Sequence, residues 1–154
     1  MRERVRRIGQ KLINESFPIL HGMKIHFIVL RFRFFALSVW IPPFIRFVII
    51  SRRTRNFSDE VLTGILAHEL CHQERYSGMG IGGYMKFVAR YTLSNKTRTD
   101  EERATDTLTI EKGYGRNLYE LTLLSQNDKN HKSILDNYLT PEEIKTYSMS
   151  IGKW

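Results

Sequence analysis

The residues of this sequence best suited to chemistry are His68-Glu69-Leu70-Cys71-His72, which form the pattern His-Glu-x-x-His. On an α-helix, residues four apart lie one turn apart on the same face, so both imidazoles can contact one metal ion. Glu69 projects about 80° to one side of that pair's mean direction, so its carboxylate can reach a water held by the metal without ligating the metal. A zinc ion lowers the pKa of such a water to about 7, and the carboxylate then takes the proton as general base.

A catalytic zinc site also needs a third protein ligand and an open fourth position. The candidate is Glu102, because Glu102-Arg103-Ala104-Thr105-Asp106 places two carboxylates four residues apart on one face of a helix. One carboxylate can ligate the metal while the other, Asp106, accepts the free N–H of a ligand histidine and fixes its tautomer. His131, in a polar stretch further along the chain, is the weaker candidate. Imidazole and carboxylate ligands serve several divalent metals, of which zinc is the expected one.

Purely structural interpretations of the same residues remain open at this point. The two histidines of the motif can be surface residues in i,i+4 contact, with the glutamate between them solvated. Thr99-Asp100-Glu101-Glu102 fits a capping box, in which Glu102 would bond back to the N–H of Thr99 instead of ligating a metal. Glu101 is expected to face a different direction on its helix.

The elements that must position these residues are expected to form one domain over residues 1–154, in three stretches. Residues 1–22 form a basic N-terminal helix whose apolar residues recur at helical spacing: Val5, Ile8, Leu12 and Ile13. That apolar stripe either packs on the domain, which is the favoured interpretation, or anchors the helix to a membrane surface. Residues 23–57 form a β region with strands at 25–30, 35–41 and 44–50, and Pro42-Pro43 separates the last two.

The β region is unusually aromatic, with seven Phe and Trp residues from Phe27 to Phe47. That density exceeds what one buried face of a small sheet needs. Either helices cover both faces of the sheet, or some of these side chains line a groove or touch a membrane.

Residues 58–154 are expected to be helical and to hold the zinc site. Ser58 is the predicted N-cap of the helix that carries the motif, and Thr99 and Gly113 are the predicted start and end of the third helix. The expected helices span 58–76, 84–93, 99–113 and 116–125, with a last one opened by Thr140-Pro141. Strands followed by helices predict an α+β fold, with a small N-terminal sheet of about three strands packed on the motif helix and on further C-terminal helices.

The combination of His68-Glu69-x-x-His72 with Glu102-x-x-x-Asp106 resembles the gluzincin group of zinc metallopeptidases. The short chain, with strands before the motif helix, is most similar to the minimal single-domain members, called minigluzincins; the resemblance covers about residues 35–113. It implies a zincin-like fold and a metalloendopeptidase with one zinc ion per chain, bound by His68, His72 and Glu102. It further implies that Glu69 is the general base and acid, that Asp106 orients His68, and that an edge strand holds a peptide or protein substrate in extended form.

Two features of an active peptidase stay open in the sequence. An oxyanion donor is required, and nothing selects among Tyr76, Tyr84, Tyr91 and Tyr114. The chain can also be a catalytically silent zinc-binding interaction module, or a latent enzyme whose tail, residues 148–154, covers the cleft.

The positive charge of the 154-residue chain, +8 overall, is concentrated near its N-terminus. Residues 1–57 hold 12 Lys and Arg against Glu3 and Glu15, a balance of +10, and the remaining residues balance at −2. This asymmetry raises the possibility that the basic N-terminal region contacts an anionic membrane surface or, less expectedly, nucleic acid. A peripheral binder of this kind is an alternative to the peptidase and can also coexist with it. The only cysteine, Cys71, excludes an intrachain disulfide and is expected in the core, which suits a cytoplasmic protein, free or peripheral to a membrane.

Overall fold

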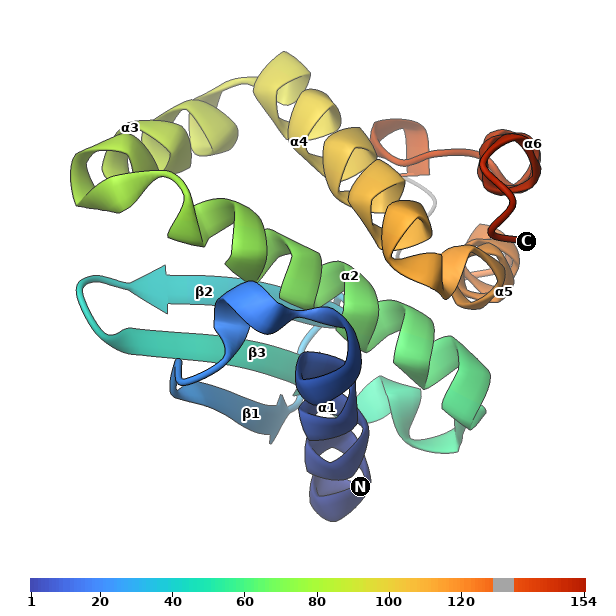
Figure 1. The fold of residues 1–154 in the computed structure, drawn as a ribbon, viewed down its shortest axis with the longest axis horizontal. Coiled ribbons are helices and arrows are strands. Elements are labelled where there is room, and N and C mark those ends of the chain that lie inside the picture. The colour runs from blue at the N-terminus through green and yellow to red at the C-terminus, as the bar shows by residue number, and fades with distance from the viewer. Residues whose placement is uncertain (129–134) are drawn as a thin grey trace.

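The computed structural model describes residues 1–128 and 135–154 and confirms the α+β class (Figure 1). The β region holds three strands, each within one residue of its predicted bounds. The strands are β1 (Ile25–Leu30), β2 (Ala36–Ile41) and β3 (Ile45–Ser51). The longer helices are α1 (Arg2–Ser16), α2 (Asp59–Ser77), α3 (Gly80–Leu93), α4 (Asn95–Thr109), α5 (Gly115–Gln126) and α6 (Pro141–Ser150).

The three strands form a mixed sheet in the order β1-β3-β2. β1 pairs parallel to β3, and β2 forms an antiparallel hairpin with β3. β2 is therefore an edge strand. It passes beside α2, the helix that carries His68 and His72.

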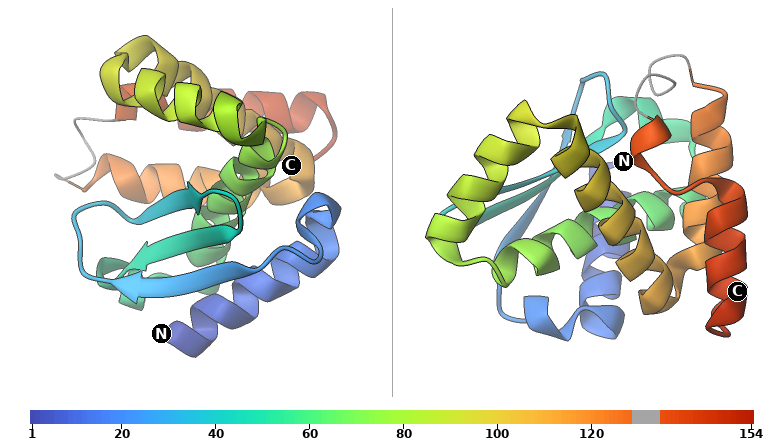
Figure 2. Two further views of the ribbon diagram at one scale, coloured as in Figure 1. Left: turned by 90° about the vertical axis from the view of Figure 1, so that its left-hand side faces the viewer. Right: turned by 90° about the horizontal axis from the view of Figure 1, so that it is seen from above.

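One face of the sheet packs against α1 and α2 (Figures 1 and 2). Side chains alternate between the two faces of a strand, so every second residue of β2 and β3 points at the helices. The Ser38 hydroxyl donates to the Glu69 carbonyl over 2.6 Å, and Arg46 donates to the side-chain oxygen of Gln73 over 3.1 Å. These two bonds fix β2 and β3 against the motif helix.

The apolar stripe of α1 is buried in the core rather than free for a membrane. Val5 is 0% and Leu12 3% exposed, and a Cβ added at Gly9 would lie 2.4 Å from the Phe27 ring. The favoured interpretation, that this helix packs on the domain, is confirmed. None of the helices in the described parts of the chain is long and apolar enough to cross a membrane.

α2 begins where predicted, because the Ser58 hydroxyl accepts the N–H of Val61. Its middle is buried on nearly all sides, since α1, α5 and the sheet all contact it. α5 crosses it closely at Gly64, where an added Cβ would lie 2.4 Å from the Asn117 carbonyl oxygen. A glycine at this crossing thus allows the two backbones to approach.

Two predicted helix starts are wrong. α4 begins at Asn95 rather than at Thr99, because the Ser94 hydroxyl caps it by accepting the N–H of Thr97. Thr99 is inside the helix, and its hydroxyl donates to Asn137. α3 begins at Gly80 instead of residue 84, so its glycines lie within a helix and not between the two helices expected at 58–76 and 84–93. Aromatic packing holds this helix in place.

The later helix boundaries follow the sequence more closely. Gly113, with φ of +93°, interrupts the helical geometry in the kink over Ile110–Tyr114 between α4 and α5, at the position where a helix end was predicted. α6 starts at Pro141, with a complete capping box between Thr140 and Glu143. The fold thus brings α4 alongside α2, and the last helix against α5.

Candidate metal centre

Three side chains predicted as metal ligands meet in a buried cluster between α2 and α4. One ligating atom from each of His68, His72 and Glu102 lies within 4.8 Å of the others. The two Nε2 atoms lie 3.2 and 3.3 Å from the same oxygen, Oε2 of Glu102. The two imidazole rings are 4.8 Å apart and nearly perpendicular, as expected for histidines on successive turns. Two nitrogens and one carboxylate oxygen form a donor set that can hold a divalent metal ion.

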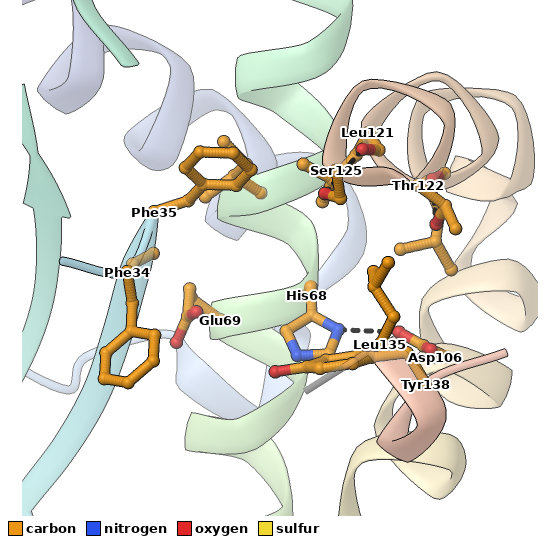
Figure 3. A pocket seen from close by; sticks show the side chains of 13 residues that line it. Phe34, Phe35, His68, Glu69, Asp106, Leu121, Thr122, Ser125, Leu135 and Tyr138 are labelled. Carbon is orange, nitrogen blue, oxygen red and sulfur yellow. Dashed lines mark hydrogen bonds and ion pairs between the residues drawn. The ribbon is translucent and has the colours of Figure 1, made fainter. Parts of the chain in front are cut away.

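The outer nitrogen of His68 is held by the carboxylate predicted to orient it. His68 Nδ1 donates to Asp106 Oδ1 over 2.9 Å, as the dashed line in Figure 3 shows. The second oxygen of Asp106 accepts the backbone N–H of Leu139 over 2.9 Å. With Nδ1 occupied as a donor, Nε2 is left as the nitrogen that faces the cluster.

His72 has an equivalent outer partner that the sequence analysis missed. Its Nδ1 donates to Glu101 Oε1 over 3.3 Å, with the Thr105 hydroxyl at 3.2 Å. Arg75 holds the same carboxylate with two hydrogen bonds of 2.9 and 2.7 Å. Glu101, expected to face a different direction on its helix from Glu102, still reaches the cluster, because α4 lies alongside both histidines: Glu101 contacts Nδ1 of His72, and Glu102 contacts Nε2 of both rings. Arg75 follows His72 by three residues and so lies on the same side of α2, and this spacing could have indicated that one carboxylate contacts both.

The electrostatics of the cluster favour positive charge on the two histidines. Burial alone would lower the pKa of His68, but its hydrogen bonds to Asp106 and Glu102 outweigh burial and raise that pKa well above the ordinary value. The same balance of burial against the Glu102 charge and the bonds to Glu101 and Glu102 raises the pKa of His72 to about 9. Glu102 is buried too, yet the two histidines hold its pKa well below the usual range. A bound cation would replace the protons in this role.

Glu69 lies beside the three ligands without belonging to their cluster. Its side chain is buried, and Oε2 has no hydrogen-bond partner in the described residues. Burial raises the pKa of this carboxyl above its ordinary value. A carboxylate with an unsatisfied buried oxygen is poised to accept a proton from a group that enters the site.

Two cavities meet at the cluster, and His68, Glu69 and Tyr138 line both. The first cavity, shown in Figure 3, is mainly apolar and lies between α2, α5 and the start of β2; its apolar lining includes Phe34, Phe35, Ile65, Leu118, Leu121 and Leu135. The second lies between β2 and α3, and includes His72, Glu102 and four aromatic residues beyond Tyr138: Tyr76, Tyr84, Phe87 and Tyr91. The site is therefore open on both sides of Glu69.

The outer edge of β2 borders the second cavity. The Trp40 N–H donates to the Tyr84 hydroxyl over 3.2 Å instead of to β3. In an antiparallel ladder, alternate residues direct their N–H and C=O groups to the same side. The N–H groups of Ala36 and Ser38 therefore face the same open edge, where an extended chain can pair with them.

The tyrosines singled out in the sequence have different surroundings. The Tyr91 hydroxyl donates to Glu102 Oε1, and Tyr76 stacks on the His72 ring at 5.7 Å. Tyr114 instead bonds to Ser16, away from the cluster. Tyr138, which is not among the tyrosines singled out as oxyanion donors, has its ring 5.8 Å from that of His68.

The chain end does not lie over the site. Trp154 packs edge-on against Tyr119 of α5, with ring centroids 5.3 Å apart, and neither residue lines the two cavities. The idea of a tail covering the cleft is therefore wrong for residues 148–154. His131 lies outside the described residues.

No protein-family model, curated protein or solved structure matches this chain. What the chain does has to be inferred from its own residues. Those residues form a buried two-histidine, one-carboxylate cluster that can hold a metal ion, with the carboxyl group of Glu69 beside it and open space on either side.

Proposed function

We propose that the protein is a zinc-dependent peptidase of the gluzincin type, which hydrolyses peptide bonds of an extended peptide or protein substrate. One observation carries the proposal. The Nε2 atoms of His68 and His72 converge on Glu102 Oε2, while the Glu69 carboxylate stands next to them with a buried, unpaired oxygen. The donor set and its open sides fit a catalytic zinc site better than a closed structural one.

When bound, a zinc ion would supply Lewis acidity toward the scissile carbonyl and lower the pKa of the attacking water. The Glu69 carboxylate would accept one proton from that water as the water oxygen bonds to the carbonyl carbon of the substrate. Glu69 would then give the proton to the leaving nitrogen as the C–N bond breaks. The raised pKa of Glu69 suits this exchange, because a carboxyl group whose pKa lies closer to 7 can both accept and release a proton near neutral pH.

The substrate would bind along the free edge of β2. Backbone pairing with Ala36 and Ser38 would hold an extended chain without regard to its side chains. The two cavities on either side of Glu69 would then receive side chains from each side of the scissile bond. Tyr76, Tyr91 and Tyr138 all lie beside the cluster and are the candidate hydroxyl donors to the developing oxyanion.

Metal content is the first test. Elemental analysis of the protein purified without chelator should give close to one zinc per chain. Glu102→Ala should reduce that value clearly, and the matched variant Glu120→Ala, an exposed carboxylate on α5, should not. A wild-type protein that stays metal-free after zinc is added would contradict the proposal.

Catalysis is tested separately with Glu69→Gln, which keeps the size of the side chain and removes the proton acceptor. We expect this variant to retain zinc and to lose cleavage of a peptide library by at least about 100-fold. A variant that still cleaves at the wild-type rate would remove Glu69 from the mechanism. Zinc binding without any cleavage by the wild type would instead favour a non-catalytic zinc module.

A further inference from the structure

The face of the sheet opposite α2 is almost entirely apolar. Its side chains lie in cross-strand rows, because Ile28 and Leu37 both pair with Ile49, and His26 and Val39 both pair with Phe47. The His26 and Phe47 rings are 5.5 Å apart, which places them on the same side. We call this surface the open sheet face; its residues are His26, Ile28, Leu30, Leu37, Val39, Ile41, Ile45, Phe47 and Ile49.

No helix of the described residues covers the open sheet face. α1 and α2 pack on the other side of the sheet, and α3 contacts β2 at Trp40, which also lies on that other side (Figures 1 and 2). Leu37 is 48% and Ile41 51% exposed on the face, and Phe44, at the hairpin tip beside it, is 82% exposed. A contiguous apolar surface of this kind marks a site of contact with a lipid or protein partner.

The charged side chains on the strands and loops of the sheet are all positive. From Ser16 to Ser58 the chain contains no Asp or Glu, so no strand and no loop of the sheet carries an acidic side chain. Arg31 and Arg52 directly follow the paired residues Leu30 and Ser51, so both lie at the same end of the sheet, and both are exposed. Exposed Lys24 precedes β1 at the opposite end.

We propose that the open sheet face docks on a membrane surface rich in anionic lipid. Acyl chains and the headgroup boundary would receive the aliphatic side chains and Phe44, while the lysine and arginines at the strand ends would contact negative headgroups. In this proposal the open sheet face, and not α1, is the part of the basic N-terminal region that contacts the membrane. The proposal does not depend on the peptidase function.

Two other partners fit the same surface less well. A second copy of the chain packed face to face would bring together two sheets whose strands and loops, within residues 16–58, each hold seven Lys and Arg and no carboxylate to compensate. Nucleic acid would satisfy the cations, but it would leave the isoleucine, leucine and valine side chains without an apolar partner. Anionic lipid supplies both kinds of contact at once.

Co-sedimentation with phosphatidylcholine vesicles, with and without phosphatidylserine, tests the proposal. Ile41, Phe44 and Ile45 are exposed and do not line the metal-site cavities, so I41S/F44S/I45S removes apolar contacts while sparing the core. We expect this variant to bind phosphatidylserine vesicles about tenfold or more weakly than wild type. The control I19S/M149S/I151S removes three exposed apolar residues elsewhere and should bind as wild type does.

A charge arm separates lipid docking from a general attraction of positive protein. R31Q/R33Q/R52Q should weaken binding more than K96Q/K145Q/K153Q, which removes the same number of charges from the helical region. Equal losses from the two charge variants, or unchanged binding of I41S/F44S/I45S with native far-UV circular dichroism, would overturn the proposal. So would a wild-type dimer in solution that I41S/F44S/I45S converts to monomers, or binding to duplex RNA that this variant abolishes.

The depth of Phe44 gives a second, direct measurement. F44W adds a third tryptophan to Trp40 and Trp154, and the emission that it adds to the wild-type spectrum should shift to the blue when phosphatidylserine vesicles are added and be quenched by brominated lipid. M149W, which changes an exposed residue of α6, should show neither effect. An F44W emission that stays unshifted in the presence of vesicles that bind the protein would overturn the assignment of this face.

Discussion

The Nδ1 of His72 donates to Glu101 Oε1 over 3.3 Å, and so gives His72 an anionic partner that matches Asp106 on His68. Both candidate ligand histidines are therefore oriented by carboxylates from α4. Arg75 fixes the Glu101 carboxylate in turn with two hydrogen bonds. The cluster is ordered by bonds that lie outside the three ligands themselves.

Loss of the Glu101 carboxylate should weaken metal binding. We expect Glu101→Ala to reduce zinc affinity about 10- to 100-fold, because His72 loses the bond that sets its tautomer and ring orientation. Glu101→Gln, whose amide oxygen can still accept from Nδ1, should recover part of that loss. The measurement is a competition titration against a chromogenic chelator, with Glu120→Ala as the control. An affinity equal to wild type in Glu101→Ala would contradict the role given to Glu101.

Two glycine-to-alanine substitutions should change stability in opposite directions. Gly64→Ala would place a Cβ 2.4 Å from the Asn117 carbonyl oxygen, and we expect it to destabilise the fold by about 1–3 kcal/mol. Gly82→Ala is in a helix with no heavy atom within 4 Å of the added Cβ, and should stabilise by about 0.5–1 kcal/mol. Urea unfolding curves measure both. Equal stabilities of the two variants would show that the α2–α5 crossing relaxes freely.

The Arg103–Glu143 pair should make stability depend on acid pH. Hydrogen bonds from Arg103 and from the Thr140 N–H hold the pKa of Glu143 below its ordinary value of 4.5. The folded state therefore binds this proton less readily than the unfolded chain, and the contribution is present above pH 4.5 and is lost as the pH falls through the lowered pKa. Thermal unfolding of wild type and Glu143→Gln should converge in acid and separate at neutral pH. A constant difference at all pH values would contradict this.

The only thiol should be unreactive in the folded protein. Cys71 is buried, and burial raises its pKa to about 12, so little thiolate exists at pH 8 and no reagent reaches it. We expect no labelling by a disulfide reagent without denaturant, and one thiol per chain in urea. Rapid labelling of the native protein would show that α2 opens locally.

The parts of the structure that the sequence predicted share a local cause. The cap at Ser58 and the capping box at Thr140 are formed by residues within one helical turn, and the histidine spacing is fixed by a single helix. Glu102 lies close to the histidines because α4 packs against α2, and the resemblance to a known motif suggested this pairing of helices. Local pattern and motif together located the site.

The parts that the sequence did not predict depend on contacts between distant elements. Ser94 outcompetes Thr99 as the cap of α4, and Thr99 bonds instead to Asn137 in a later segment. Glu101 meets His72 only because α4 lies alongside α2, a relation that helical periodicity alone does not contain. The aromatic excess of the β region was noted, but only the arrangement of α1 and α2 shows that helices cover one face of the sheet.

The edge strand β2 lies between the metal cluster and any surface that the open sheet face contacts. Ser38 points toward α2 and the metal cluster, whereas Leu37 belongs to the opposite face. Because Leu37 and Ser38 are consecutive residues, only the thickness of a single sheet separates these two faces. A protein seated on lipid through this sheet would therefore hold the metal cluster one sheet's thickness from the headgroups.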